Sequence, residues 1–203
     1  DILIGGDGAD TIFGNFGQND IEGDAGNDFI FTGGNSIVIG GADGDSVISF
    51  GPGNIYSFNA GDSNDGISTT VDDFTISLGG GINLADLSLS QNPFNVSLSV
   101  GGADSIQIQS DLADSRRWGL ITLQLINGGV ATTYDFNAVL EEFYRQADQN
   151  PDINFNLPIN GLLAAHVLTT GNTQIIGGEI ERSIVIIDEA HNLVSRIVNK
   201  ISS

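Results

Sequence analysis

Apolar residues recur in the first third of the chain in short, strand-like steps rather than in helical stripes. From Gly5 the sequence reads GGDGADTIF, GNFGQNDIE and GDAGNDFIF, three consecutive units of nine residues. Glycines gather in the first half of each unit, an Asp or Asn stands at the sixth position, and an aliphatic residue stands at the eighth (Ile12, Ile21 and Ile30). A fixed short period of this kind indicates a solenoid in which each unit contributes one strand.

The spacing loosens after residue 31, but an acid or amide still precedes an apolar residue by two positions. The four further matches are Asn35-Ser36-Ile37, Asp45-Ser46-Val47, Asn54-Ile55-Tyr56 and Asp65-Gly66-Ile67. The glycine-rich half of a unit favours a turn with positive φ, and the other half favours a short strand with one inward apolar side chain. We therefore expect two units per coil of a right-handed parallel β-roll over residues 1–70, enclosing a ladder of Ile and Val.

Residues 71–135 change to a period of two, interrupted by glycine pairs. Phe74, Ile76 and Leu78 alternate with Thr and Ser, and so do Leu87 and Leu89. This pattern is typical of half-buried antiparallel strands joined by turns. The predicted fold class is thus mostly β, a parallel β-roll followed by antiparallel strands.

Residues 136–203 favour a helical segment. Asp135 is placed to cap a helix that has one apolar stripe. The stripe consists of Phe136, Val139, Leu140, Phe143 and Ala147. Beyond it we expect a linker between Pro151 and Pro158, a short helix over residues 162–168 that ends at Gly171, and an amphipathic helix from Ile180.

The charge of the chain is strongly acidic and unevenly distributed. The formal net charge is −20, from 26 acidic and 6 basic residues. Residues 1–115 contain 17 acids and no Lys or Arg, whereas residues 116–203 contain 9 acids and all six basic residues. This balance excludes binding to nucleic-acid phosphates and argues against docking on an anionic membrane. With 40% hydrophobic residues, the chain is too apolar for simple disorder, so the first part is expected to recruit cations.

Oxygen atoms of the chain are the expected ligands of these cations. The chain has no cysteine, so a metal must bind to oxygen or imidazole, and no apolar run approaches the 18 or so residues of a membrane span. Turn carbonyls and Asp carboxylates together suit Ca²⁺, which accepts six to eight oxygen ligands in flexible geometry.

Alternate units stack on the same edge of a roll, which sorts the acids and amides into two rows. One edge collects Asp10, Asp28, Asp45 and Asp65. We expect Ca²⁺ between Asp10 and Asp28 and between Asp28 and Asp45. A site between Asp45 and Asp65 is expected to be weaker because of the insertion there.

The other edge turns from acid to amide. It collects Asp1, then Asn19, Asn35 and Asn54. An amide oxygen can bind Ca²⁺ but brings no charge to offset desolvation of the ion, so this edge is expected to be weakly occupied or empty.

An alternative is that these residues only form Asx turns. Seven repetitions of the same signature favour the metal interpretation. The acids outside the two rows (Asp7, Asp20, Asp43 and Asp62) are expected to be solvated turn residues or to support the ligands.

The three complete units resemble the G-G-x-G-x-D-x-U-x nonapeptide of RTX proteins, which bacteria export by type I secretion. The resemblance covers residues 1–68, and residues 1–4 resemble the tail of an earlier unit, so the array is expected to continue upstream. It also implies further ligands. These are the backbone carbonyls of Gly6, Gly8, Asp24, Gly26 and Gly41.

The two later segments also resemble parts of RTX proteins. The succession of a strand, GGGI, a D-L-x-L strand, GGADSI and a last strand resembles the haemolysin-type calcium-binding-related domain, which implies that residues 71–135 cap the roll. The acid-poor, amphipathic end of the chain resembles an uncleaved type I secretion signal. An ordinary helical subdomain is the alternative there. Arg116, Arg117 and Trp118 form the first cationic spot, interpreted as a surface turn or as a contact to an acidic edge.

No motif supports an enzyme. The run IVIIDEAHNL at residues 184–193 resembles motif II of DEAH helicases, but the phosphate-binding G-x-x-x-x-G-K-[ST] loop is missing. His166 and His191 are isolated in the sequence and do not indicate zinc.

The sequence therefore predicts a non-enzymatic module for calcium-dependent folding, capping and secretion at the C-terminus of a large extracellular RTX protein. The expected partners are calcium ions and the type I secretion machinery, and the expected location is outside a bacterial cell or on its surface. An adhesin or surface protein is the favoured parent. The alternative parent is a secreted enzyme or pore-forming toxin, and a third interpretation is that the roll itself binds a glycan or a cell surface.

Overall fold

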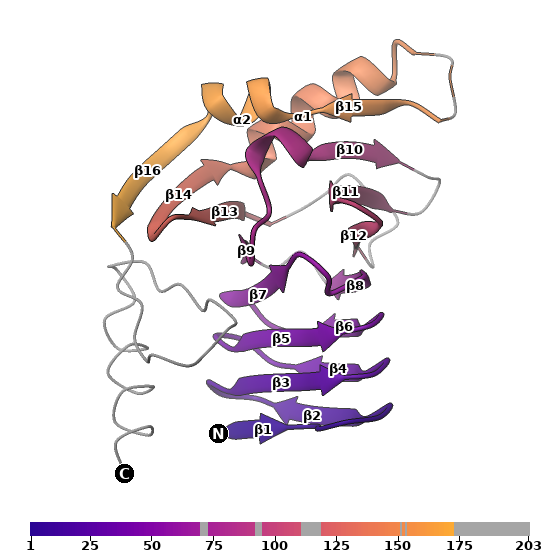
Figure 1. The fold of residues 1–203 in the computed structure, drawn as a ribbon, viewed down its shortest axis with the longest axis vertical. Helices are drawn as coiled ribbons and strands as arrows, with labels where there is room; N and C mark the ends of the chain where they lie inside the picture. The colour runs from indigo at the N-terminus through magenta and orange to yellow at the C-terminus, as the bar shows by residue number, and fades with distance from the viewer. Residues whose placement is uncertain (70–72, 92–94, 111–118, 151, 153, 173–203) are drawn as a thin grey trace.

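The structure is a computed structural model, in which residues 1–69, 73–91, 95–150, 152 and 154–172 are described, apart from 111–118. Within this part, the fold is mostly β and is built on two eight-stranded sheets. The chain alternates between the sheets, so each coil gives one strand to each of them (Figure 1).

Parallel pairing defines the roll. The first sheet contains β1 (Ile2–Ile4), β3 (Asp20–Ala25), β5 (Ile37–Ala42), β7 (Asn54–Asn59) and β9 (Phe74–Gly79). The second contains β2 (Thr11–Asn15), β4 (Phe29–Thr32), β6 (Ser46–Ser49) and β8 (Asn64–Thr69). Neighbouring strands within each set pair in parallel, so the predicted parallel β-solenoid is confirmed, with about four turns.

The strand register aligns the inward apolar residues into the two ladders that form the core. In the second sheet Ile12 pairs with Ile30, Ile30 with Val47, and Val47 with Ile67. In the first sheet the ladder is Ile21, Val38, Tyr56 and Ile76. All eight side chains are buried. The nine-residue spacing thus predicted the inward positions of Ile12, Ile21 and Ile30 correctly.

The strands of the middle segment are only partly antiparallel. Antiparallel pairs are formed by β10 (Ser88–Gln91) with β11 (Val96–Gly101), β11 with β12 (Asp104–Ser110), and β13 (Ile121–Asn127) with β14 (Val130–Asp135). However, β9 pairs in parallel with β7, β13 with β9, and β12 with β8. The segment thus contains the predicted antiparallel pairs, but its parallel pairing with the roll was not predicted, because alternation reports which face is buried and not the direction of the partner strand.

The helix expected after Asp135 is present. It is α1 (Phe136–Ala147), and Asp135 Oδ1 accepts a hydrogen bond from the Ala138 N–H at 3.1 Å. Its buried residues are those of the predicted stripe. A short 3₁₀ helix, η1 (Leu84–Asp86), lies between β9 and β10.

The elements after α1 differ from the prediction. The short helix is α2 (Asn160–Ala165), and the chain continues as β16 (Val167–Asn172), which pairs with β14. The expected linker contains β15 (Asn156–Pro158), which pairs with β10. Pairing with strands far away in the sequence overrides the local helical and linker signals. The predicted helix from Ile180, the cationic spot at 116–118 and the DEAH-like run lie outside the described residues.

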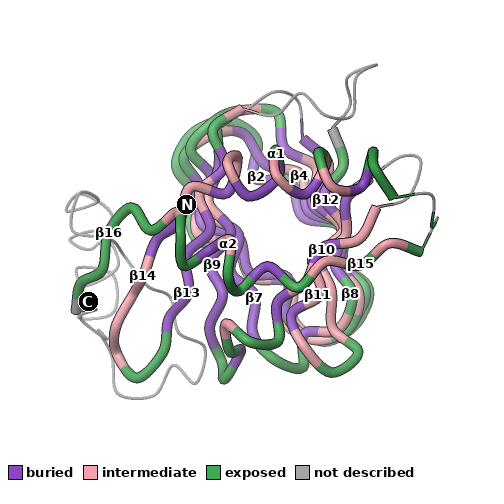
Figure 2. The backbone as a smooth tube through the Cα atoms, turned by 90° about the horizontal axis from the view of Figure 1, so that it is seen from above, coloured by how far each residue is buried: buried purple, intermediate pink, exposed green. Residues whose placement is uncertain are grey.

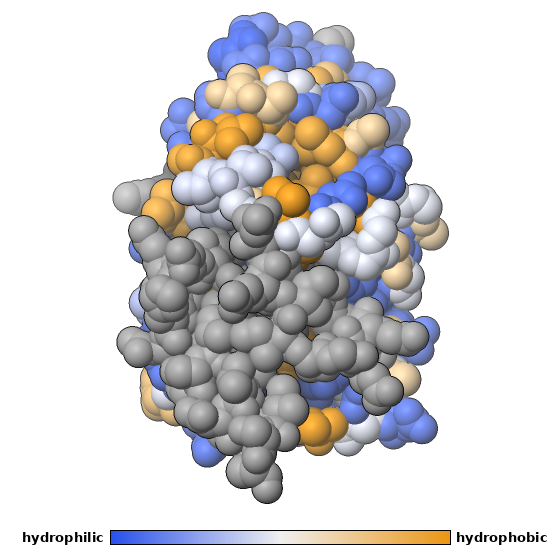
Figure 3. Space-filling view, turned by 60° about the vertical axis from the view of Figure 1, so that its left-hand side comes forward, coloured by the Kyte–Doolittle hydropathy of each residue, from blue (hydrophilic) through white to orange (hydrophobic). Residues whose placement is uncertain are grey.

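A view along the stack of coils shows how the roll and the later strands are arranged. In Figure 2 the coils superimpose as a ring, and β13, β14 and β16 extend from it to one side. Hydrophilic residues cover most of the coloured surface in Figure 3, with hydrophobic residues gathered in its upper part. None of the described helices has the length and apolar content needed to cross a membrane.

Candidate metal centre

The turns of the roll lie along two edges with different chemistry. The turns that lead from the first sheet to the second contain or precede Asp10, Asp28, Asp45 and Asp65, and we name this row the aspartate edge. The turns that lead back contain Asn19, Ser36 and, at the start of β7, Asn54, and we name this row the asparagine edge.

Hydrogen bonds connect the four carboxylates of the aspartate edge into a ladder. The Asp10 N–H donates to Asp28 Oδ1 at 2.8 Å, the Asp28 N–H to Asp45 Oδ1 at 2.8 Å, and the Asp45 N–H to Asp65 Oδ1 at 2.9 Å. The structure therefore brings together all four residues that the repeat placed in one row. The longer step to Asp65 keeps the same ladder contact in spite of the insertion.

The second oxygens of the central carboxylates have no hydrogen-bond partner within the part of the chain that the structure describes. Asp28 Oδ2 and Asp45 Oδ2 are buried and unpaired, and their residues are only 1% and 2% exposed. Burying an anionic oxygen without a partner is unfavourable by several kcal/mol or more, so such a group either binds a proton or recruits a cation. Burial raises the pKa of Asp45 to about 6 and that of Asp65 to about 8, and neighbouring carboxylates add to the rise.

Glycines make room beside these oxygens. A Cβ on Gly23 would lie 2.2 Å from Asp28 Oδ2 and 2.3 Å from the Gly40 carbonyl oxygen, and a Cβ on Gly40 would lie 2.3 Å from Asp45 Oδ2. A carboxylate oxygen and a carbonyl oxygen thus converge on the same small space, and neither can donate a hydrogen bond to the other. The residues present fit a hard cation such as Ca²⁺.

The five carbonyl candidates lie along the aspartate edge, three in its turns (Gly6, Gly8 and Gly26) and two near the ends of β3 and β5 (Asp24 and Gly41). All have positive φ: 94° at Gly6, 118° at Gly8, 74° at Asp24, 126° at Gly26 and 115° at Gly41. The Gly8 carbonyl oxygen lies against the Cα of Gly26, and the Asp24 carbonyl oxygen lies against the Cα of Gly41. Stacked coils therefore place these carbonyls in rows, and their role as ligands stays a prediction.

Backbone oxygens would have to supply much of any metal site. No group of three or more Asp, Glu, His or Cys side chains with metal-binding geometry occurs among the described residues. This agrees with a ladder in which each coil contributes a single carboxylate.

The asparagine edge differs from the prediction at one position. The Asn19 N–H donates to Ser36 Oγ at 3.3 Å, and the Ser36 N–H donates to Asn54 Oδ1 at 2.9 Å. Ser36, not Asn35, stands in the row. Asn35 is exposed and adopts a φ of 61°, a left-handed conformation that Asn tolerates better than most residues, and this turn moves the row on by one residue.

The amide nitrogens of this edge donate to turn carbonyls. Asn19 Nδ2 donates to Gly14 O at 2.8 Å, and Asn54 Nδ2 donates to Gly33 O at 2.7 Å and Gly51 O at 2.9 Å. Asn19 and Asn54 are only 3% and 1% exposed. The buried polar groups of this edge thus satisfy one another.

Two further acids, Asp62 and Asp104, approach the end of the ladder. Asp62 is buried and accepts the Asn59 N–H at 2.8 Å, which agrees with the supporting role that was one of its two predicted alternatives and not with a solvated residue. Asp104, from β12, accepts the Gly61 N–H at 2.6 Å. Both carboxylates contribute to the raised pKa of Asp65. Only the fold brings Asp104 to this turn, because 39 residues separate it from Asp65 in the chain.

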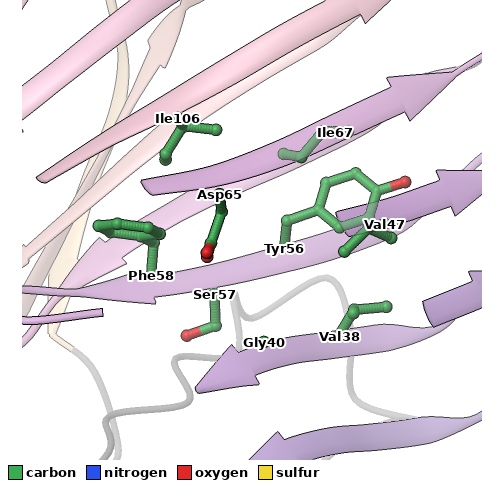
Figure 4. A pocket seen from close by; sticks show the side chains of 9 residues that line it. All are labelled: Val38, Gly40, Val47, Tyr56, Ser57, Phe58, Asp65, Ile67 and Ile106. Carbon is green, nitrogen blue, oxygen red and sulfur yellow. The ribbon is translucent and has the colours of Figure 1, made fainter. Parts of the chain in front are cut away.

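Asp65 also faces the core. Its side chain extends between Phe58 and Tyr56 into a cavity of about 20 Å³ (Figure 4). Ile67 and Ile106 line the same cavity. The apolar surroundings explain why desolvation is the largest cause of the raised pKa.

Acid is expected to promote folding in calcium-free buffer. The pKa values of Asp45 and Asp65 are higher in the fold, at about 6 and about 8, than the ordinary value of 3.8. The folded chain therefore binds protons that the unfolded chain has lost, and this stabilisation is present at low pH and disappears as the pH rises through 6 to 8. Far-UV circular dichroism at pH 5 and pH 8.5 should show more strand at pH 5. Asp65→Asn should reduce the change between pH 7 and 8.5, and an unchanged profile would contradict the assignment to Asp65.

Comparison with known families identifies the first coils. Residues 1–30 match the family model of the RTX calcium-binding nonapeptide repeat, described as four copies. Comparison of the chain with curated proteins finds no match. The match ends at residue 30, so the resemblance of residues 71–135 to a haemolysin-type calcium-binding-related domain stays a prediction. RTX nonapeptide repeats bind Ca²⁺. The N-terminal coils of this chain, which carry Asp10 and Asp28 of the aspartate edge, are thus similar to RTX calcium-binding repeats over residues 1–30.

Proposed function

We propose that calcium binding along the aspartate edge drives the folding of this chain, which serves as the calcium-dependent module of a secreted RTX-type protein. The buried, unpaired Oδ2 atoms of Asp28 and Asp45 carry the proposal, the first beside the carbonyl oxygen of Gly40 and the second in the space that a Cβ on Gly40 would fill. In this role the module is structural and not catalytic.

The proposed ions lie between Asp10 and Asp28 and between Asp28 and Asp45. The carbonyls of Gly6, Gly8, Asp24, Gly26 and Gly41 complete their oxygen ligands. A third position between Asp45 and Asp65 is weaker, because a carboxyl with a pKa of about 8 is mostly protonated at neutral pH and must lose its proton to bind the ion. Asn19 and Asn54 hold calcium weakly or not at all, and Asn35, which is exposed and lies outside the row, is no longer proposed as a weak ligand.

Charge explains why the module stays unfolded before export. The 17 acids of residues 1–115 have no Lys or Arg among them, and their repulsion opposes a compact chain when calcium is scarce. Extracellular calcium sites typically have dissociation constants of about 0.1–1 mM. At a hundredfold excess of calcium each site adds about 2.7 kcal/mol, so two sites rival the whole stability of a small domain.

The later segments are proposed to cap and export the roll. The buried residues of α1, among them Phe136 and Phe143, belong to the same hydrophobic cluster as Ile30 and Ile67. In Figure 1, α1 lies at the end of the stack opposite to β1. The proposed division is a roll (1–70), a capping segment (71–135) and a C-terminal region (136–203). The type I secretion signal proposed in the last region rests on the resemblance of its sequence.

The favoured parent is a bacterial adhesin or surface protein. The second candidate, the accessory tail of a secreted enzyme or pore-forming toxin, would use the same calcium-dependent module. Tandem Ig-like repeats elsewhere in the parent would identify an adhesin, and a protease, lipase or pore-forming domain would identify the other class.

Calcium removal tests the proposal directly. Far-UV circular dichroism at pH 7.5 should show strand structure in millimolar CaCl₂ and its loss in EGTA, with recovery when calcium is restored. MgCl₂ at the same ionic strength is the control, because it screens charge but prefers a rigid octahedral site. A chain that keeps its strand content in EGTA would contradict calcium-coupled folding.

A further inference from the structure

The two edges of the roll have similar ladders of hydrogen bonds, but the side chains place acceptor oxygens in the turns of one edge and donor NH₂ groups in the turns of the other. On the asparagine edge, we propose that the side-chain NH₂ groups of Asn19 and Asn54 take the place of calcium ions, so that this edge closes without metal. The inference rests on the proposed function, because it assumes that the aspartate edge binds calcium.

The positions on the two edges correspond. Asn19 follows Gly14 by five residues, as Asp28 follows Gly23 and Asp45 follows Gly40. The Ser36 N–H donates to Asn54 Oδ1 at 2.9 Å, just as the Asp28 N–H donates to Asp45 Oδ1 at 2.8 Å. At Asn54, as at Asp45, Oδ1 therefore maintains the ladder and the second atom of the side-chain head group faces the turn, whereas the Asn19 N–H donates to Ser36 Oγ.

The orientation of the Asn54 amide follows from this ladder. Only the oxygen of an amide can accept the Ser36 N–H, so the nitrogen must point the other way. It donates to Gly33 O at 2.7 Å, Ser49 Oγ at 2.8 Å and Gly51 O at 2.9 Å. Three oxygens thus converge on one amide nitrogen that is shielded from water.

The two edges differ in the second atom of the side-chain head group, which is an anionic acceptor on the aspartate edge and a hydrogen-bond donor on the asparagine edge. On the aspartate edge an anionic oxygen lies near a carbonyl oxygen, and only a bound cation or proton can offset the repulsion between these two acceptors. On the asparagine edge N–H donors meet carbonyl oxygens, and each pair is satisfied within the chain. Calcium therefore controls one edge of each coil, and the other edge is fixed by the sequence.

The substitution Asn54→Asp tests whether replacing the side-chain NH₂ group by an oxygen converts closure without metal into calcium binding. It keeps Oδ1 as the acceptor of the Ser36 N–H and replaces the donor by an anionic oxygen. Calcium titration of the 203-residue chain by isothermal calorimetry should give one more bound ion than the wild type. Folding followed by circular dichroism should then require a higher calcium concentration. Asn35→Asp is the matched control: it adds the same charge at an exposed position outside the row, and should leave the ion count unchanged. Equal ion counts in Asn54→Asp and the wild type would overturn the proposal.

A second variant covers the case in which Asn54→Asp does not fold. Asn54→Ala removes the contacts of both Oδ1 and Nδ2 and should lower the urea midpoint in saturating CaCl₂ without changing the ion count. If Asn54→Ala binds one ion fewer than the wild type, the amide is a calcium ligand and the proposal is wrong. This result differs from failure of the proposed function, in which the wild type itself binds no calcium.

Discussion

Asp28→Asn is expected to remove two calcium ions from the roll with a single substitution. Asp28 stands between Asp10 and Asp45, so both proposed ions share its carboxylate. Asparagine keeps an acceptor for the Asp10 N–H but loses the charge and the orphaned Oδ2. At a hundredfold excess of calcium, losing two sites should cost about 5 kcal/mol of calcium-dependent stability. Calorimetric ion counts and urea unfolding in CaCl₂ measure both effects.

The effect of Asp28→Asn should reverse its sign in EGTA. Without calcium the wild-type carboxylate is buried next to other acceptors, whereas the variant would place an NH₂ group near the Gly40 carbonyl oxygen. The variant should therefore keep more strand structure than the wild type in EGTA. Asp7→Asn is the matched control, because it removes the same charge from an exposed turn residue. The same ion count in both variants would contradict the assignment of the central ligand to Asp28.

Residues within the regular repeats were predictable because their information is local. Nine residues fill one turn and one strand, so the inward positions of Ile12, Ile21 and Ile30 follow from counting along the chain. The row from Asp10 to Asp65 follows from the repeated signature, since Asp10, Asp28 and Asp45 directly precede a strand of the second sheet and Asp65 is the second residue of one. Even the insertion before Asp65 did not matter, because the signature of acid and inward apolar residue marks the start of the strand.

Outside the regular repeats, the structure depends on backbone conformation and strand pairing, which cannot be predicted by counting residues along the sequence. Both Asn35 and Ser36 are polar turn residues, and only the left-handed φ at Asn35 decides that Ser36 joins the row. The strand β16 pairs with β14 over a long separation in sequence, and this pairing replaces the end of the expected helix. The β-branched residues Val167, Thr169 and Thr170 were the local signal for a strand.

The chemistry of the site required the fold as well. The sequence predicted which side chains meet but not that Asp28 Oδ2 and Asp45 Oδ2 are buried without partners. Nor could it show that the amide of Asn54 points its nitrogen at three oxygens. From the sequence, the Asn54 amide was expected to be a poor calcium ligand. Its orientation in the fold instead makes its NH₂ group a hydrogen-bond donor, which we propose takes the place of a calcium ion.

Gly26→Ala is expected to prevent neighbouring coils from stacking at the aspartate edge. An added Cβ would lie 2.0 Å from the carbonyl oxygen of Gly8 and 2.5 Å from its carbon. Both are backbone atoms, so no side-chain rotation can relieve the overlap. Gly26 also has a φ of 126°, a conformation that L-residues rarely adopt and that adds about 1–3 kcal/mol of strain. Strain and overpacking together should lower the free energy of unfolding by about 2–6 kcal/mol.

Gly61→Ala separates these two causes. Gly61 has a φ of 97°, yet a Cβ there would meet no atom within 4 Å, so this variant suffers the backbone strain without the overlap. Urea unfolding in saturating CaCl₂ should show a clearly larger loss for Gly26→Ala than for Gly61→Ala. The overlap would also move the Gly8 carbonyl, so the calcium concentration needed for folding should rise more in Gly26→Ala than in Gly61→Ala. Equal losses and equal calcium dependence in the two variants would mean that the coils do not need the close approach of Gly8 and Gly26 to bind calcium.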